Sequence, residues 1–139
     1  MKRKEEMSSS QEDYLETILM LKRKKGTVRS TDVAEALGFS RPSVCNAMSL
    51  LAESGYLWLD EKKEIQLTPK GIRAAEKVYE RHMFFKRQLL KAGVAEEQAG
   101  ADACRMGHAI SAESFEKLKE SLEGHPEIWD GLHDAGAQG

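Results

Sequence analysis

The sequence lacks long apolar runs: its longest stretches, Ile18 to Leu21 and the serine-interrupted Met48 to Leu51, contain only a few apolar residues. A membrane-spanning helix needs about 20 such residues, so the sequence predicts no membrane segment. The charged N-terminus is not followed by the apolar segment of a signal peptide, and we therefore expect a cytoplasmic protein.

Cysteine, proline and excess positive charge are also scarce. The 139 residues include two cysteines and three prolines, and 21 Lys+Arg stand against 23 Asp+Glu for a net charge of −2. Two cysteines in a reducing compartment are more typical of thiols or metal ligands than of a disulfide. The charge balance excludes nonspecific coating of DNA, so any DNA contact must come from local geometry.

What the sequence does contain is a series of helical patterns and one hairpin pattern, in a chain long enough for one domain or two small ones. Apolar residues recur at spacings of three and four, as in the stripe formed by Ile72, Ala75, Val78 or Tyr79, His82, Phe85 and Leu89. After Gly55 the pattern changes to two short strand-like runs around a charged tip. The sequence predicts helices over about 10–25, 31–37, 41–54, 69–93, 96–110 and 112–123, strands over 56–59 and 64–67, and a loosely held tail after about 124.

The order of helix, helix, tight turn, helix and hairpin predicts a winged helix-turn-helix over residues 1–71, within a mainly α fold. The third helix begins with short polar groups and one guanidinium, and its apolar residues lie on the opposite face. Taken singly, Ser40 to Ser43 are more typical of a helix cap and Lys62-Lys63 of a solvated turn than of DNA contacts, but their combination in this order favours DNA binding. The candidate base contacts are Ser40, Arg41, Pro42, Ser43 and Asn46, and the candidate phosphate contacts are Arg29, Lys62 and Lys63.

Polar residues at helical spacing form a second group of candidates. Asp13 and Glu16 are three residues apart on the first helix, Cys104 and His108 are four apart on the fifth, and His82 lies on the stripe of the long helix. Thiolate, imidazole and carboxylate together suit Fe(II), Zn(II), Co(II), Ni(II) or Mn(II). The same residues are also typical of helix N-terminal acids, a hydrogen-bonded histidine and a small core residue, and spacing alone does not bring the three helices together.

A set of motifs lies along the chain, at Glu12 to Glu16, Asp32 to Leu37, Ser40 to Val44, Leu67 to Gly71, Arg81-His82 and Ala103 to Ser111. With these motifs, the chain from Ser9 to Glu123 resembles the diphtheria toxin repressor and manganese transport regulator family, in the two-domain form without the SH3-like domain. The resemblance implies that an all-α metal-binding and dimerisation domain, residues 72–139, follows the winged helix. It also implies a homodimer that binds palindromic operators and represses metal uptake genes when it holds Fe(II) or Mn(II), with Zn(II) as a further possibility.

The resemblance also implies a metal ligand set, matched position by position. The first-helix carboxylates correspond to the manganese branch, the long-helix histidine to both branches, and the cysteine and histidine of the fifth helix to the iron branch. Such a mixed set can make one four- or five-coordinate site, in which the thiolate shifts the preference from Mn(II) toward Fe(II) or Zn(II). The implied ligands are Asp13, Glu16, His82, Cys104 and His108.

Three positions depart from the family pattern. Gly107 stands where the fifth helix of the family has a glutamate, and Lys86 and Gly100 stand where the iron branch has ancillary ligands. Asp102 lies nearby and is a possible substitute. These departures leave the number and the identity of the metal ions open.

The resulting hypothesis is that a metal ion joins the two domains and thereby fixes the spacing of two recognition helices. The alternative is a winged helix regulator that no longer senses metal or responds to another small ligand. An enzyme is not expected, because the sequence shows no paired general acid and base, glycine-rich phosphate loop or nucleophile elbow.

Overall fold

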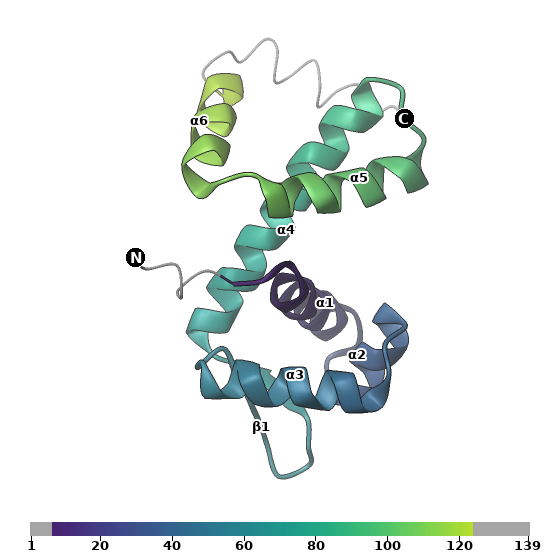
Figure 1. The fold of residues 1–139 in the computed structure, drawn as a ribbon, viewed down its shortest axis with the longest axis vertical. Helices are drawn as coiled ribbons and strands as arrows, with labels where there is room; N and C mark the ends of the chain where they lie inside the picture. Colours follow the sequence, from purple (N-terminus) through teal and green to yellow (C-terminus); the bar gives the residue numbers. More distant parts are fainter. Residues whose placement is uncertain (1–6, 124–139) are drawn as a thin grey trace. The chain divides into compact units, whose positions relative to one another are not determined.

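A computed structural model describes residues 7–123 of the chain. The chain divides into two compact units, Met1–Val78 and Tyr79–Gly139, and the division falls inside the fourth helix. Figure 1 shows the elements in chain order, which are α1 (Ser9–Lys25), α2 (Ser30–Leu37), α3 (Arg41–Glu53), β1 (Leu57–Leu59), β2 (Ile65–Leu67), α4 (Pro69–Lys91), α5 (Glu96–Ala109) and α6 (Ala112–Glu123). This order agrees with the predicted mainly α fold and its winged helix-turn-helix.

The first unit has one apolar core to which every one of its helices and strands contributes. A capping box begins α1: the Ser8 hydroxyl accepts from the Gln11 N–H, and the Gln11 side chain accepts from the Ser8 N–H. Gly38, in the left-handed conformation, ends α2 and allows the tight turn into α3. Residues that are fully or almost fully buried include Leu15, Ile18, Val33, Val44, Met48, Leu51, Leu57 and Ile65.

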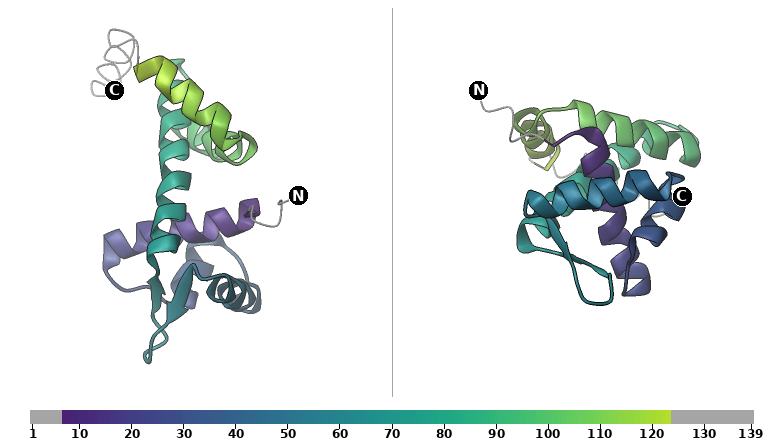
Figure 2. Two further views of the ribbon diagram at one scale, coloured as in Figure 1. Left: turned by 90° about the vertical axis from the view of Figure 1, so that its left-hand side faces the viewer. Right: turned by 60° about the horizontal axis from the view of Figure 1, so that its bottom comes forward.

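The strands β1 and β2 form an antiparallel hairpin, the wing, which extends beyond the helices of this unit in the left view of Figure 2. Leu57 pairs with Leu67 and Leu59 pairs with Ile65. The N–H of Ile65 also donates to the carbonyl of Val28 at 2.7 Å, so the chain before α2 flanks the second strand. The buried side chains of the two strands anchor the wing in the core.

The segment that follows α3 is hydrogen-bonded to the start of α4. The Thr68 hydroxyl donates to the carbonyl of Gly55 at 2.6 Å, and the Thr68 N–H donates to the carbonyl of Tyr56 at 3.1 Å. The Lys70 ammonium lies 4.5 Å from the centre of the Tyr56 ring. At Gly71 a Cβ would overlap the carbonyl oxygen of Tyr56, so only glycine permits this close approach.

The second unit is held by an aromatic core between α4 and α6. Phe115 is 2% exposed, and its ring meets the rings of Phe84 and Phe85 at centroid distances of 5.4 and 6.0 Å. Small residues on α5 allow close packing, since a Cβ at the buried Gly107 would lie 3.3 Å from the Cβ of Arg81 on α4. At the surface, Lys119 donates to Glu80 at 2.6 Å.

The observed ends of the helices and strands differ from the predicted ones by up to two residues, and the predicted burial of Ile72 is wrong. The second helix begins at Ser30, one residue earlier than predicted, because the Asp32 carboxylate accepts from the N–H of Arg29 at 2.8 Å and caps the helix. Ile72, predicted to begin the apolar stripe of α4, is 38% exposed. The neighbouring Gly71 takes the buried position against the wing, which turns Ile72 outward.

Candidate functional site

Burial divides α3 into two faces, as the sequence predicted. Val44, Met48 and Leu51 are buried, whereas Ser40, Arg41, Pro42, Ser43 and Asn46 are exposed. The Ser40 hydroxyl caps the helix by accepting from the Ser43 N–H at 3.3 Å, and it donates to the Ser43 hydroxyl at 3.0 Å. The start of α3 is therefore well ordered and presents polar groups to solvent.

Two further residues lie on the exposed face of α3 and were not predicted as candidates. Cys45 and Ser49 are both exposed. Cys45 follows Arg41 by four residues, and Ser49 follows Cys45 by four. Residues four apart share one face of a helix, so this spacing was the available signal. The surface of the recognition helix is thus wider than the predicted set.

The wing carries the predicted phosphate contacts. Lys62 and Lys63 at its tip are exposed, and Lys63 adopts a left-handed backbone conformation with φ 68°. Hydrogen bonding, foremost from the N–H of Glu64, holds the pKa of Asp60 below its usual value. The guanidinium of Arg29 lies 3.9 Å from the Glu64 carboxylate. Arg29 therefore forms an ion pair with the wing while its side chain stays exposed to solvent.

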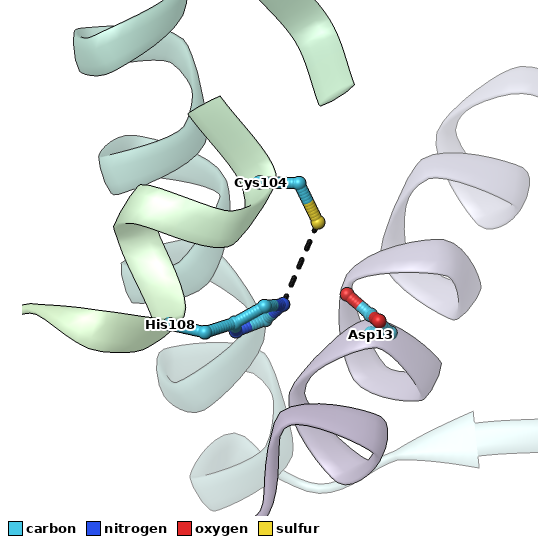
Figure 3. A group of neighbouring side chains, drawn as sticks. All are labelled: Asp13, Cys104 and His108. Carbon is cyan, nitrogen blue, oxygen red and sulfur yellow. Dashed lines mark hydrogen bonds between the residues drawn. The ribbon is translucent and has the colours of Figure 1, made fainter. Parts of the chain in front are cut away.

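In the second unit the structure brings Cys104 and His108 together. They lie one turn apart on α5, are both half-buried, and their side chains meet with Sγ and Nε2 3.5 Å apart (Figure 3). His82 is a half-buried residue of α4, and its backbone nitrogen lies 3.8 Å from the position of a Cβ at Gly107. The α5 segment that carries the Cys104 and His108 pair therefore packs against α4 near His82.

The two predicted carboxylate ligands belong to the first unit. Asp13, labelled in Figure 3, and Glu16 are both half-buried residues of α1. Both are close in sequence to Tyr14 and Leu15. Because Tyr14 and Leu15 are buried, they anchor α1 in the core of the first unit.

The positions that depart from the family pattern have other structural partners. The Lys86 ammonium pairs with Glu96 at 3.4 Å, and its Cε lies 4.0 Å from the position of a Cβ at Gly100. Asp102 accepts from the amide of Gln98 at 3.0 Å and pairs with Arg105. An ammonium at position 86 repels a metal cation, so the ancillary ligand set is not reproduced here.

Comparison with known protein families defines the class of this fold. Residues 6–65 match the iron dependent repressor N-terminal DNA binding domain, and residues 68–128 match the iron dependent repressor metal binding and dimerisation domain. The fold and the two matched domains identify the chain as a metal-dependent, DNA-binding transcriptional repressor, a class of protein that is not enzymatic. The chain belongs to the iron dependent repressor family.

Individual relatives agree with this assignment. The chain is 36% identical over 119 residues to an uncharacterized HTH-type transcriptional regulator of Methanocaldococcus jannaschii, covering 84% of this chain and 95% of that protein. It is 33% identical over 122 residues to the HTH-type transcriptional regulator MntR of Lysinibacillus sphaericus, covering 86% and 88%. A manganese-dependent transcriptional repressor solved in complex with manganese is 25% identical, with a TM-score of 0.71 over 81% of this chain. The chain spans about half, 52%, of the length of that solved repressor.

Helix length and composition bear on membrane insertion. Within residues 7–123, none of the helices combines the length and the apolar character that crossing a membrane requires.

Proposed function

We propose that this chain is a homodimeric repressor that binds a palindromic operator when a divalent metal ion is held by Cys104 and His108. The observation that carries the proposal is the 3.5 Å separation of Cys104 Sγ and His108 Nε2. Bond lengths of ~2.3 Å to sulfur and ~2.0–2.1 Å to imidazole nitrogen, at a tetrahedral angle, put two ligand atoms about 3.5 Å apart. The pair therefore fits one ion without rearrangement of α5.

The remaining ligands are proposed from the family resemblance. His82, on the neighbouring helix of the same unit, adds a second imidazole, and Asp13 and Glu16 add carboxylates from α1. This set provides four or five donors from three helices, which suits a transition metal. The thiolate favours Fe(II) or Zn(II) over Mn(II), whereas the carboxylates also suit Mn(II), so we propose Fe(II) or Mn(II) with Zn(II) as a competitor.

We propose one metal ion in each protomer. The positions that would build an ancillary site hold Lys86, with its ion pair to Glu96, and Gly100, which has no side chain. Asp102 is engaged by Gln98 and Arg105. A second ion at this place would have to displace the Lys86 ammonium.

On the DNA side, the exposed start of α3 reads base edges, and the wing binds phosphates. The proposed base contacts are Ser40, Arg41, Pro42, Ser43 and Asn46, and the proposed phosphate contacts are Arg29, Lys62 and Lys63. A dimer presents two such helices, which reach half-sites about one helical turn apart. Its two-fold symmetry requires a palindromic operator.

In the proposed regulation, metal binding by Cys104 and His108 on α5 determines the distance between the two recognition helices of the dimer. When bound, the divalent ion supplies positive charge and one coordination centre. Side chains from α1, α4 and α5 that share this centre favour one arrangement of the dimer, and the population shifts toward the arrangement that fits DNA. The division of the chain into a DNA-binding domain, residues 1–71, and a metal-binding and dimerisation domain, residues 72–139, remains a prediction from the sequence.

The first experiment measures metal binding at Cys104. Co(II) titration of the wild type should produce the absorption of a cobalt–thiolate bond. Cys104→Ser should abolish this absorption, while the matched Cys45→Ser variant should keep it, because Cys45 is an exposed residue of α3. Retention in Cys104→Ser would exclude Cys104 as a ligand.

The second experiment measures DNA binding with and without metal. The probe is a duplex selected from a random-sequence pool by the full chain in the presence of Fe(II), Mn(II) or Zn(II). Metal should strengthen binding in the wild type, and Cys104→Ala or His108→Ala should remove this effect. Equal affinity in all variants, with and without metal, would contradict metal sensing and favour a regulator that responds to another ligand.

A further inference from the structure

The tip of the wing is built around one carboxylate. Asp60 Oδ1 accepts from the backbone N–H groups of Lys62 and Glu64, each at 2.9 Å. The Asp60 carbonyl also accepts from the N–H of Lys63 at 2.9 Å. These bonds hold the turn in which Lys63 takes its left-handed backbone conformation, which lysine rarely adopts.

A glutamine connects this carboxylate to the body of the unit. Gln66 Nε2 donates to Asp60 Oδ2 at 3.0 Å, and Gln66 Oε1 accepts from the Lys22 ammonium on α1 at 3.1 Å. The same ammonium donates to the carbonyl of Ile65 at 2.9 Å. An ammonium can only donate and an ionised carboxylate can only accept, so the amide of Gln66 has a single orientation that satisfies both.

The cations of this region consequently have different roles. Lys22 is half-buried and directs its ammonium into the wing, although it stands in the basic last turn of α1. Arg29 shares its charge with Glu64. Lys62 and Lys63 are exposed at the tip, where their side chains are available to a polyanion.

We propose that Gln66 is a positioning residue for DNA binding. The relay from Lys22 through Gln66 to Asp60 fixes the turn before DNA arrives, so Lys62 and Lys63 reach phosphates without ordering the tip on binding. The inference rests on the proposed phosphate contacts of these two lysines. Gln66 itself touches no DNA in this scheme.

A double-mutant cycle tests the relay. The probe is the selected duplex described above, and binding by the metal-loaded full chain is measured over a range of salt concentrations. Lys62→Ala/Lys63→Ala should weaken binding and reduce the salt dependence by about one counterion per lost phosphate contact. Gln66→Leu should weaken binding by about tenfold and reduce the same salt dependence, since it releases the tip.

The combined variant distinguishes positioning from general stabilisation. When the two lysines are already alanines, Gln66→Leu should have no further effect on DNA affinity. The matched control is Gln98→Leu, which removes another glutamine–aspartate bond of 3.0 Å, on α5, and should leave affinity unchanged. Additive losses would overturn the positioning role.

A reciprocal substitution tests the direction of the hydrogen bonds and does not depend on Gln66→Leu folding. Gln66→Glu alone opposes two carboxylates and should open the tip. Asp60→Asn/Gln66→Glu reverses donor and acceptor, keeps an acceptor for Lys22, and should restore wild-type affinity and salt dependence. Failure of this rescue would overturn the relay.

The lysine variant distinguishes failure of the proposed phosphate contacts from failure of the proposed role of Gln66. If Lys62→Ala/Lys63→Ala binds DNA like the wild type, the proposed wing contacts are wrong and the inference fails with them. If the lysine variant loses affinity while Gln66→Leu does not, only the inference is overturned. Thermal unfolding of every variant checks that the unit remains folded.

Discussion

Truncation of Phe115 to alanine should destabilise the second unit by about 3–5 kcal/mol. Its ring is 2% exposed and packs against those of Phe84 and Phe85, at 5.4 and 6.0 Å. The edge contact with Phe84 contributes about 0.5–1.5 kcal/mol beyond the burial of apolar area. Because the Phe115 ring is almost fully buried and contacts both other rings, we expect a loss of stability in the upper part of this range.

The assay is urea unfolding at fixed protomer concentration, because dimerisation makes apparent stability depend on concentration. Hydrogen exchange of peptides from α6 should accelerate in parallel, since Phe115 anchors this helix. The matched control is Leu118→Ala on the same helix, at a side chain that is 41% exposed, with an expected cost below about 1 kcal/mol. A loss below about 1.5 kcal/mol for Phe115→Ala, or equal losses for the two variants, would refute this account of the core.

Three further outcomes concern the first unit. Gly71→Ala should lower the free energy of unfolding by about 1–3 kcal/mol, because its Cβ would overlap the carbonyl of Tyr56; an unchanged melting temperature would contradict that contact. Ser40→Ala should cost about 1 kcal/mol through loss of the α3 cap, and the urea midpoint measures it. The hydrogen bond from Lys25 lowers the pKa of Asp32, so its contribution to stability is complete above about pH 4 and is lost as pH falls through the lower folded-state value. Asp32→Asn should therefore flatten the acid limb of the stability curve, and an unchanged limb would exclude this role.

Local patterns predicted most of the fold because the signals for its elements lie within a few residues. The spacing of Tyr14, Leu15 and Ile18 identifies the buried face of α1, and the change of period after Gly55 identifies the wing. The winged helix-turn-helix was predicted on this basis, and its placement within a mainly α chain is confirmed.

The candidate site was less accessible from sequence, since its important bonds connect distant residues. Lys22 and Gln66 are 44 positions apart, and nothing in the run of basic residues distinguishes the one lysine that enters the wing. Gly107 stands where the family pattern has a glutamate, and sequence alone does not show that a Cβ there would lie 3.3 Å from the Cβ of Arg81 on the neighbouring helix. Of the predicted ligands, Cys104 and His108 were the easiest to pair because a single helix turn determines their separation.

The joint between α3 and α4 has a mechanical consequence. Because Thr68 is bonded to Gly55 and Tyr56, which follow α3, and a Cβ at Gly71 would overlap the carbonyl of Tyr56, we expect a rotation of the first turn of α4 to turn the end of α3 with it. The 13 residues of α3 make that helix about 20 Å long, so a tilt of about 10° moves its N-terminal end by about 3 Å. That displacement is close to the ~3.4 Å rise of one base pair. We therefore expect a small angular change at this joint to move the N-terminal end of α3 by about the rise of one base pair.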